Sequence, residues 1–150
     1  MATANVTAGN SGQARVCHSH PSVEDAASRI LIVSSVAEDC QELRKALVSH
    51  ACPRHWTSTV EEAANWLSCN SARVVICDDK LPDGSWRQLW KQVRRLPNPP
   101  VFIVSAGWTD ARLWAEVLNV GAYDVLVKPY RKSEVTRILQ HACRIVEHFA

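Results

Sequence analysis

Short apolar runs recur along the chain from Arg29 onward, and most of their residues are β-branched. Four of these runs are residues 30–33, 74–77, 101–104 and 125–127. Continuous runs of this length are typical of strands that are buried on both faces, as in a parallel sheet. We expect a fifth, weaker strand around residues 54–58, where mixed polarity is typical of an edge strand.

The segments between these runs carry apolar residues at helical spacing. One such set is Trp86, Leu89, Trp90 and Val93. Thr59 and Glu62 are a candidate capping box at the start of another helix, and Ser133 is the expected N-cap of the last helix. Strands that alternate with helices in this way predict an α/β fold, a doubly wound five-stranded parallel sheet with helices on both faces.

Residues 1–28 have a different composition from the rest of the chain. They are rich in Ala, Thr, Asn, Ser and Gly and contain few large apolar side chains. Such a segment buries too little surface to offset the entropy lost on ordering. We therefore expect a disordered tail over residues 1–28 and one folded domain over residues 29–150.

Charge and hydropathy exclude several classes of partner. The net charge of the 150 residues is +2, which is too small to predict nucleic-acid binding. No apolar run approaches the ~18 residues of a membrane span, and the N-terminus lacks a secretory signal pattern. We expect a cytoplasmic protein that binds neither nucleic acid nor membrane.

The chain contains six cysteines, and none of them forms a C-x-x-C pair. A structural zinc site is therefore not expected. Reduced core or surface thiols fit this pattern better than a disulfide framework.

Polar residues follow the predicted strands directly. They are Ser34 and Ser35, then Asp78 and Asp79, then Ser105, and finally Lys128. Ligands of open parallel sheets bind beyond the carboxyl ends of the strands. We therefore expect these side chains to meet at one edge of the sheet.

Four motifs carry a resemblance to a known family. Residues 78–84 match its D-x-x-[LM]-P-[DG] segment, residues 105–106 its Thr/Ser-Ala step, residues 121–124 its G-A-x-D motif and residues 128–130 its K-P-[FY] motif. In this order and spacing, the chain resembles the response-regulator receiver domains of two-component signalling from about residue 29 to residue 149. The resemblance implies a flavodoxin-like fold with strand order 2-1-3-4-5.

The resemblance also implies roles for individual residues. Asp78 would accept a phosphoryl group, Ser105 would donate a hydrogen bond to it, and Lys128 would pair with Asp78 or the phosphoryl group. The Lys128–Pro129 bond is often cis in the family. A histidine kinase or phosphotransfer protein would be the partner, and the only chemistry would be self-phosphorylation and dephosphorylation on Asp78.

The chain departs from the family directly after the first strand, where Ser34 and Ser35 replace the acidic pair that helps to bind Mg²⁺. Of the carboxylates that bind the metal in the family, only the one at Asp78 would remain. The negative charge of Asp78 and the positive charge of Lys128 sum to zero. Mg²⁺ is usually held by one or two carboxylates plus water, so we expect Mg²⁺ binding to be weak or absent. We interpret Glu38 and Asp39 as exposed first-turn acids of a helix, which favour its dipole, rather than as replacement ligands.

A second departure concerns signalling, because Val125 stands where the family often has an aromatic switch residue. Two alternatives to an ordinary receiver remain open. The chain could be a degenerate receiver, a module for protein–protein interaction that works without phosphate. It could also be a flavodoxin-like FMN protein, although residues 34–38 lack the glycine of a phosphate loop.

The helix expected over residues 110–120 is apolar on nearly every side. A surface helix of this kind is either deeply buried or faces a partner. In receivers the fourth helix lies at an edge of the molecule, so we predict homodimerisation or effector docking on the face between the fourth and fifth helices. Trp108, in the preceding loop, is expected near the mouth of the pocket.

Overall fold

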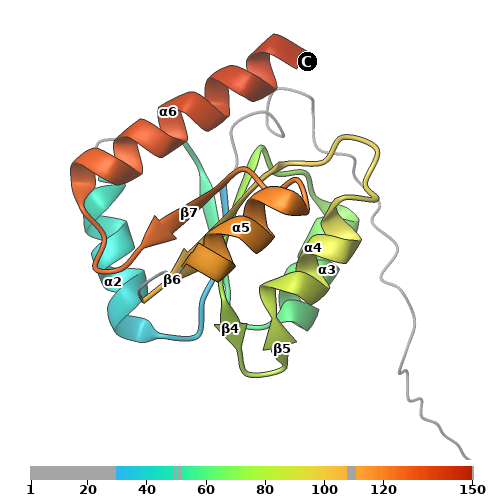
Figure 1. Ribbon diagram of the computed structural model, residues 1–150, viewed down its shortest axis with the longest axis horizontal. Helices are drawn as coiled ribbons and strands as arrows, with labels where there is room; N and C mark the ends of the chain where they lie inside the picture. The colour runs from blue at the N-terminus through green and yellow to red at the C-terminus, as the bar shows by residue number, and fades with distance from the viewer. Residues whose placement is uncertain (1–29, 49, 51, 108–110, 150) are drawn as a thin grey trace, which may run out of the picture.

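The computed structural model describes residues 30–48, 50, 52–107 and 111–149 (Figure 1). The predicted tail of residues 1–28 and the loop residue Trp108 lie outside the described residues.

Five parallel strands form the central sheet, in the order β2-β1-β3-β6-β7. They are β1 (Ile30–Val33), β2 (Arg54–Thr57), β3 (Val74–Asp78), β6 (Val101–Ala106) and β7 (Asp124–Val127). The predicted α/β class and the strand order 2-1-3-4-5 are thereby confirmed, with β2 as an edge strand. Two short strands, β4 (Lys80–Leu81) and β5 (Gly84–Ser85), pair antiparallel outside this sheet.

Helices cover both faces of the sheet (Figure 1). Helices α3 (Val60–Cys69), α4 (Trp86–Val93) and α5 (Ala111–Asn119) cover one face, and α2 (Ala37–Ala46) and α6 (Lys132–Phe149) cover the other. Side chains point alternately to the two faces along each strand. In β1, Leu31 packs toward α3 and α4, whereas Ile32 packs toward α2 and α6.

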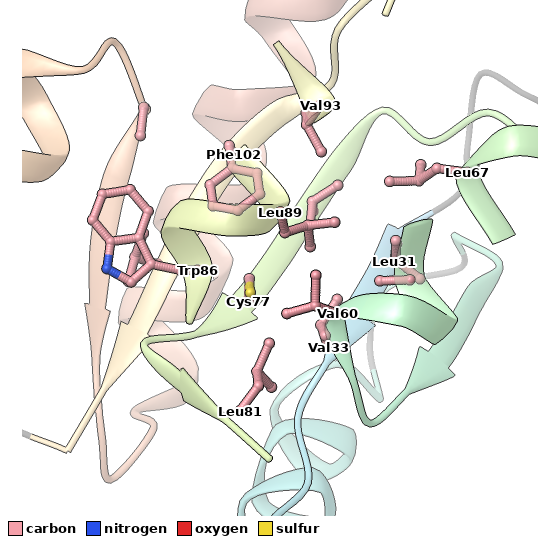
Figure 2. Close-up of a cluster of buried hydrophobic side chains, with 14 of the residues drawn as sticks. Leu31, Val33, Val60, Leu67, Cys77, Leu81, Trp86, Leu89, Val93 and Phe102 are labelled. Atoms are coloured by element: carbon pink, nitrogen blue, oxygen red, sulfur yellow. The ribbon is translucent and has the colours of Figure 1, made fainter. Parts of the chain in front are cut away.

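The core between the sheet and α3 and α4 is built around large side chains (Figure 2). Trp86 and Leu89 of α4 are 1% and 0% exposed, and both pack in one cluster with Phe102 of β6. The predicted apolar spacing of this helix is thus its buried face. This packing fixes the helix against the strands whose ends carry the polar residues.

The helix starts agree only partly with the sequence. The Thr59 side chain accepts a hydrogen bond from the backbone N–H of Glu62 at 3.0 Å, as a capping box requires. The Glu62 carboxylate, however, accepts from the backbone N–H of Ser58 rather than from that of Thr59. The prediction of Ser133 as an N-cap is wrong, because α6 already begins at Lys132.

Gly121 lies within the connection from α5 to β7 and has a φ of +88°. Only glycine adopts this left-handed conformation without strain. The G-A-x-D motif of the sequence therefore has a structural reason at its first position.

Cys40, Cys52 and Cys77 are free thiols, and Cys77 is buried. Cys69 is disulfide-bonded, so the expectation of reduced cysteines is wrong for this residue. No helix among the described residues has the length and apolar character needed to cross a membrane.

Candidate functional site

Three parallel strands end at the same edge of the sheet and carry Asp78, Ser105 and Lys128 there, whereas Ser35 of the predicted set is exposed. Asp78 is the last residue of β3, and Ser105 lies opposite it in register on β6. Lys128 follows β7, and its backbone N–H donates to the carbonyl of Ala106 at 2.8 Å. Its ammonium lies 3.1 Å from a carboxylate oxygen of Asp78.

The Asp78 carboxylate is buried, with 3% of the residue exposed, and both of its oxygens have partners. The Ser34 hydroxyl donates to Oδ2 at 2.6 Å, and the Lys128 ammonium contacts Oδ1. Burial raises the pKa of Asp78, whereas the Ser34 hydrogen bond and the charge of Lys128 lower it without cancelling the rise. The ionised carboxylate therefore depends on these two neighbours.

Lys128 lies between two carboxylates. Its ammonium also binds Oδ2 of Asp39, in the first turn of α2, at 2.6 Å. Burial lowers the pKa of Lys128, but the hydrogen bond to Asp39 and the charge of Asp78 outweigh burial, and the pKa is raised. Lys128 is thus held firmly in its charged form.

The contact with Asp39 corrects the sequence interpretation. Asp39 was expected to be an exposed first-turn acid, yet its carboxylate is about three-quarters buried and paired with Lys128. Two carboxylates and one ammonium give the cluster a net charge of −1, where the sequence predicted a neutral pair. The sequence signal for this contact is that Asp39 lies about one helical turn beyond β1. The direction of the Asp39 side chain, however, depends on where α2 begins.

Ser105 and Tyr130 form a second, uncharged contact at the site. The Ser105 hydroxyl is fully buried and lies 2.5 Å from the Tyr130 hydroxyl. Tyr130 follows the Lys128–Pro129 bond, which is cis, as the resemblance implies. Burial raises the pKa of Tyr130, so its phenol stays protonated at neutral pH. The K-P-[FY] motif pointed to Tyr130 but gave its hydroxyl no role.

The donor set differs from that of a magnesium site. Ser34 contributes a hydroxyl where the family has a carboxylate, and this hydroxyl already binds Asp78. Asp39 and Asp78 both contact an ammonium instead of leaving their oxygens free. In the described part of the chain, no group of three or more His, Cys, Asp or Glu side chains could hold a metal ion.

The outer side of α5 exposes large apolar side chains beside the polar Arg112 and Asn119. Trp114 and Leu118 of the helix and Val120 directly after it are 39%, 51% and 37% exposed, and we call these three residues the α5 surface. Val117, on the opposite side of the helix, is fully buried in the core. The predicted helix is therefore anchored along one side and exposes large apolar groups on the other.

Known proteins share the sequence pattern and the fold. The family model for the response regulator receiver domain matches residues 30–140. The two-component response regulator ARR12 of Arabidopsis thaliana is 31% identical over 120 residues, which are 77% of this chain and 20% of that protein. The regulatory protein AtoC of Escherichia coli is 23% identical over 80% of this chain and 26% of its own length. The chain thus spans about a quarter or less of these two relatives.

Solved structures agree with this match. A CheY-like receiver domain protein from Methanospirillum hungatei superposes with a TM-score of 0.73 at 20% identity, over 82% of this chain and 98% of that one. The signal receiver domain of an HD domain-containing protein from Pseudomonas fluorescens gives 0.73 at 24% identity, over 80% and 89%. With the family model matched over most of its length, this chain belongs to the response regulator receiver domain family.

Proposed function

We propose that this receiver domain accepts a phosphoryl group on Asp78 from a phosphohistidine of a histidine kinase or phosphotransfer protein. The observation that carries the proposal is the meeting of a carboxylate, an ammonium and a hydroxyl at one sheet edge. Lys128 lies 3.1 Å from Asp78, and Ser105 is its register partner on β6. The proposal places this exchange in the cytoplasm.

The proposed reaction exchanges one bond to phosphorus for another. An oxygen of the Asp78 carboxylate attacks phosphorus, an O–P bond forms, and the P–N bond of the phosphohistidine breaks. The leaving imidazole nitrogen keeps the electron pair of that bond and takes up a proton. Lys128 would neutralise charge on the phosphoryl oxygens, and Ser105 would donate a hydrogen bond to one of them.

Magnesium would contribute little to this reaction. Mg²⁺ requires near-octahedral oxygen ligands and gives up its water reluctantly, whereas Asp39 and Asp78 already bind Lys128. We therefore expect no saturable Mg²⁺ binding at submillimolar concentration in a calorimetric titration. Saturation in that range would contradict this part of the proposal.

A second candidate function is a module for protein–protein interaction that works without phosphate. It is favoured by the closed state of the site, since both oxygens of Asp78 have partners and the Ser105 hydroxyl is bound to Tyr130. A second copy of the chain or an effector protein would then bind to the α5 surface, on the side of the molecule where α5 and α6 lie. In either function, nucleic acid would not be a direct ligand.

One experiment separates the two candidates. The protein is incubated with the phosphodonor phosphoramidate, and its intact mass is followed before and after treatment with hydroxylamine, which cleaves acyl phosphates. We expect a hydroxylamine-sensitive gain of one phosphoryl group, which Asp78→Ala abolishes. Asp79→Asn is the matched control, because Asp79 is the adjacent carboxylate and should leave the gain intact. Absence of any gain in the unmodified protein would favour the phosphate-independent module.

A further inference from the structure

The Ser105 hydroxyl has one side-chain partner within the described part of the chain, and that partner is Tyr130. The two oxygens lie 2.5 Å apart, and Ser105 is 0% exposed. The oxygens of Asp78, on the neighbouring strand, are engaged by Ser34 and Lys128. The hydrogen bond between Ser105 and Tyr130 therefore involves other atoms than those of the charged cluster, although the phenol lies within electrostatic range of Asp78 and Lys128.

Chemistry favours one direction for this hydrogen bond. A phenol is a stronger acid than an aliphatic alcohol, so its O–H is the better donor of the two. If Tyr130 donates, the Ser105 oxygen is the acceptor and the Ser105 O–H is free to point elsewhere. A hydroxyl that accepts one hydrogen bond also becomes a stronger donor in the next, because bonds in a chain polarise one another.

We infer that Tyr130 is a positioning residue, whose phenol donates to Ser105 and so aims the Ser105 O–H at a phosphoryl group on Asp78. This inference rests on the proposed phosphorylation of Asp78 and adds a residue to it. Tyr130 acts on the phosphoryl group through the hydroxyl of Ser105. Its ring is packed against the core between the sheet and α2 and α6, which fixes the position of the hydroxyl.

Kinetics with matched variants test the inference. Tyr130→Phe keeps the ring and removes the hydroxyl, and we expect the rate of phosphorylation by phosphoramidate to fall about three- to ten-fold, as for one lost hydrogen bond. Ser105→Ala should slow the reaction further, and the double variant should match Ser105→Ala alone because the two hydroxyls act as one unit. Tyr123→Phe is the control, since Tyr123 packs against the same core and is the only other tyrosine.

Two results of these kinetics would overturn the inference while leaving the proposed function intact. One is an unchanged rate in Tyr130→Phe. The other is a double variant whose loss equals the product of the two single losses, because independent effects multiply.

A second measurement needs no phosphodonor. Protein labelled with fluorotyrosine should give two ¹⁹F resonances, which Tyr123→Phe assigns. We expect Ser105→Ala to shift the resonance of Tyr130 and to leave that of Tyr123 in place. An unmoved Tyr130 resonance would overturn the contact itself. A shifted resonance with no phosphorylation in any variant would instead overturn the proposed function, and with it the role of Tyr130.

Discussion

The site around Asp78 and the α5 surface depart from the usual distribution of residues in opposite directions. At the site, Asp78 and Ser105 are polar and almost completely buried. On the α5 surface, Trp114 and Leu118 are large and apolar, yet they remain exposed. Buried polar groups and exposed apolar patches are the two informative exceptions to the rule that apolar residues lie inside.

The buried polar groups and the exposed apolar groups both cost free energy, and this cost is offset in different ways. At the site, the polar groups are bound by other side chains of the protein, Asp78 by Ser34 and Lys128 and Ser105 by Tyr130. The three residues of the α5 surface stay partly exposed in the described part of the chain, and burial of this exposed area against another molecule would stabilise it. The hydrogen bonds at the site around Asp78 are directional and hold groups in place for a reaction. The apolar contacts that the α5 surface can make are non-directional and favour association with another molecule. Substitutions should therefore act differently in the two regions.

The largest effect is expected where the site around Asp78 loses its cation, Lys128. Lys128→Met leaves Asp78 and Asp39 without their common partner, and uncompensated buried charge is strongly destabilising. We expect the free energy of unfolding to fall by roughly 2–3 kcal/mol, less than for a fully buried pair because the Lys128 side chain is 15% exposed. Urea denaturation followed by circular dichroism measures this.

Lys45→Met is the matched control for that variant. The Lys45 and Glu42 side chains of α2 are 75% and 52% exposed, and exposed pairs contribute about 0–1 kcal/mol. Equal losses in the two variants would show that Lys128 is not a buried counter-ion.

A smaller effect is expected for Ser34→Ala, and it should depend on pH. The Ser34 hydrogen bond lowers the pKa of Asp78, so its removal raises a pKa that burial has already raised above the ordinary value of 3.8. The native state of the variant then binds a proton more readily than the unfolded state, and stability falls as pH rises through the raised pKa. We expect a loss of about 1–2 kcal/mol at neutral pH.

Below the ordinary pKa of an aspartate, the carboxyl is protonated in both states, and this loss should largely disappear. Thermal denaturation at several pH values checks the trend. A loss that grows as the pH falls would contradict the assigned role of Ser34.

Ser34→Asp should give the site around Asp78 a measurable affinity for Mg²⁺. A second carboxylate beside Asp78 supplies the kind of ligand that Mg²⁺ requires. We expect Mg²⁺ affinity to rise at least about tenfold, which corresponds to about 1.4 kcal/mol, in a calorimetric titration. Ser71→Asp is the control, because Ser71 is exposed and precedes β3, at the opposite end of that strand from Asp78. An equal gain from both variants would show that the increase is not specific to the site around Asp78.

The smallest effect on folding is expected at the α5 surface. Leu118 is 51% exposed, so Leu118→Glu should change the free energy of unfolding by no more than about 0.5 kcal/mol. If the surface binds a second copy, the same variant should abolish concentration-dependent dimerisation in sedimentation velocity. Asn119→Glu, at an exposed neighbouring position of the helix, is the control. A strict monomer at high concentration would remove the homodimer and leave only an effector as partner.

The sequence predicts the features that depend on repeating patterns. The buried strands follow from the apolar runs, their order is the one that the resemblance to receiver domains implies, and the structure has both. The missed features depend on individual side-chain directions. Asp39 reaches Lys128 because α2 begins at Ala37, and Tyr130 meets Ser105 through the path of the loop after β7. Neither path leaves a periodic signal in the sequence.

The direct test of the central claim is a crystal structure of the protein with beryllofluoride, which mimics a phosphoryl group, at high Mg²⁺ concentration. We predict an adduct on the Asp78 carboxylate, with the Ser105 hydroxyl and the Lys128 ammonium in contact with its fluorine atoms. Ser34→Asp provides the comparison in which metal binding is no obstacle. An adduct in Ser34→Asp but none on Asp78 of the unmodified protein would contradict the claim that this receiver accepts phosphate.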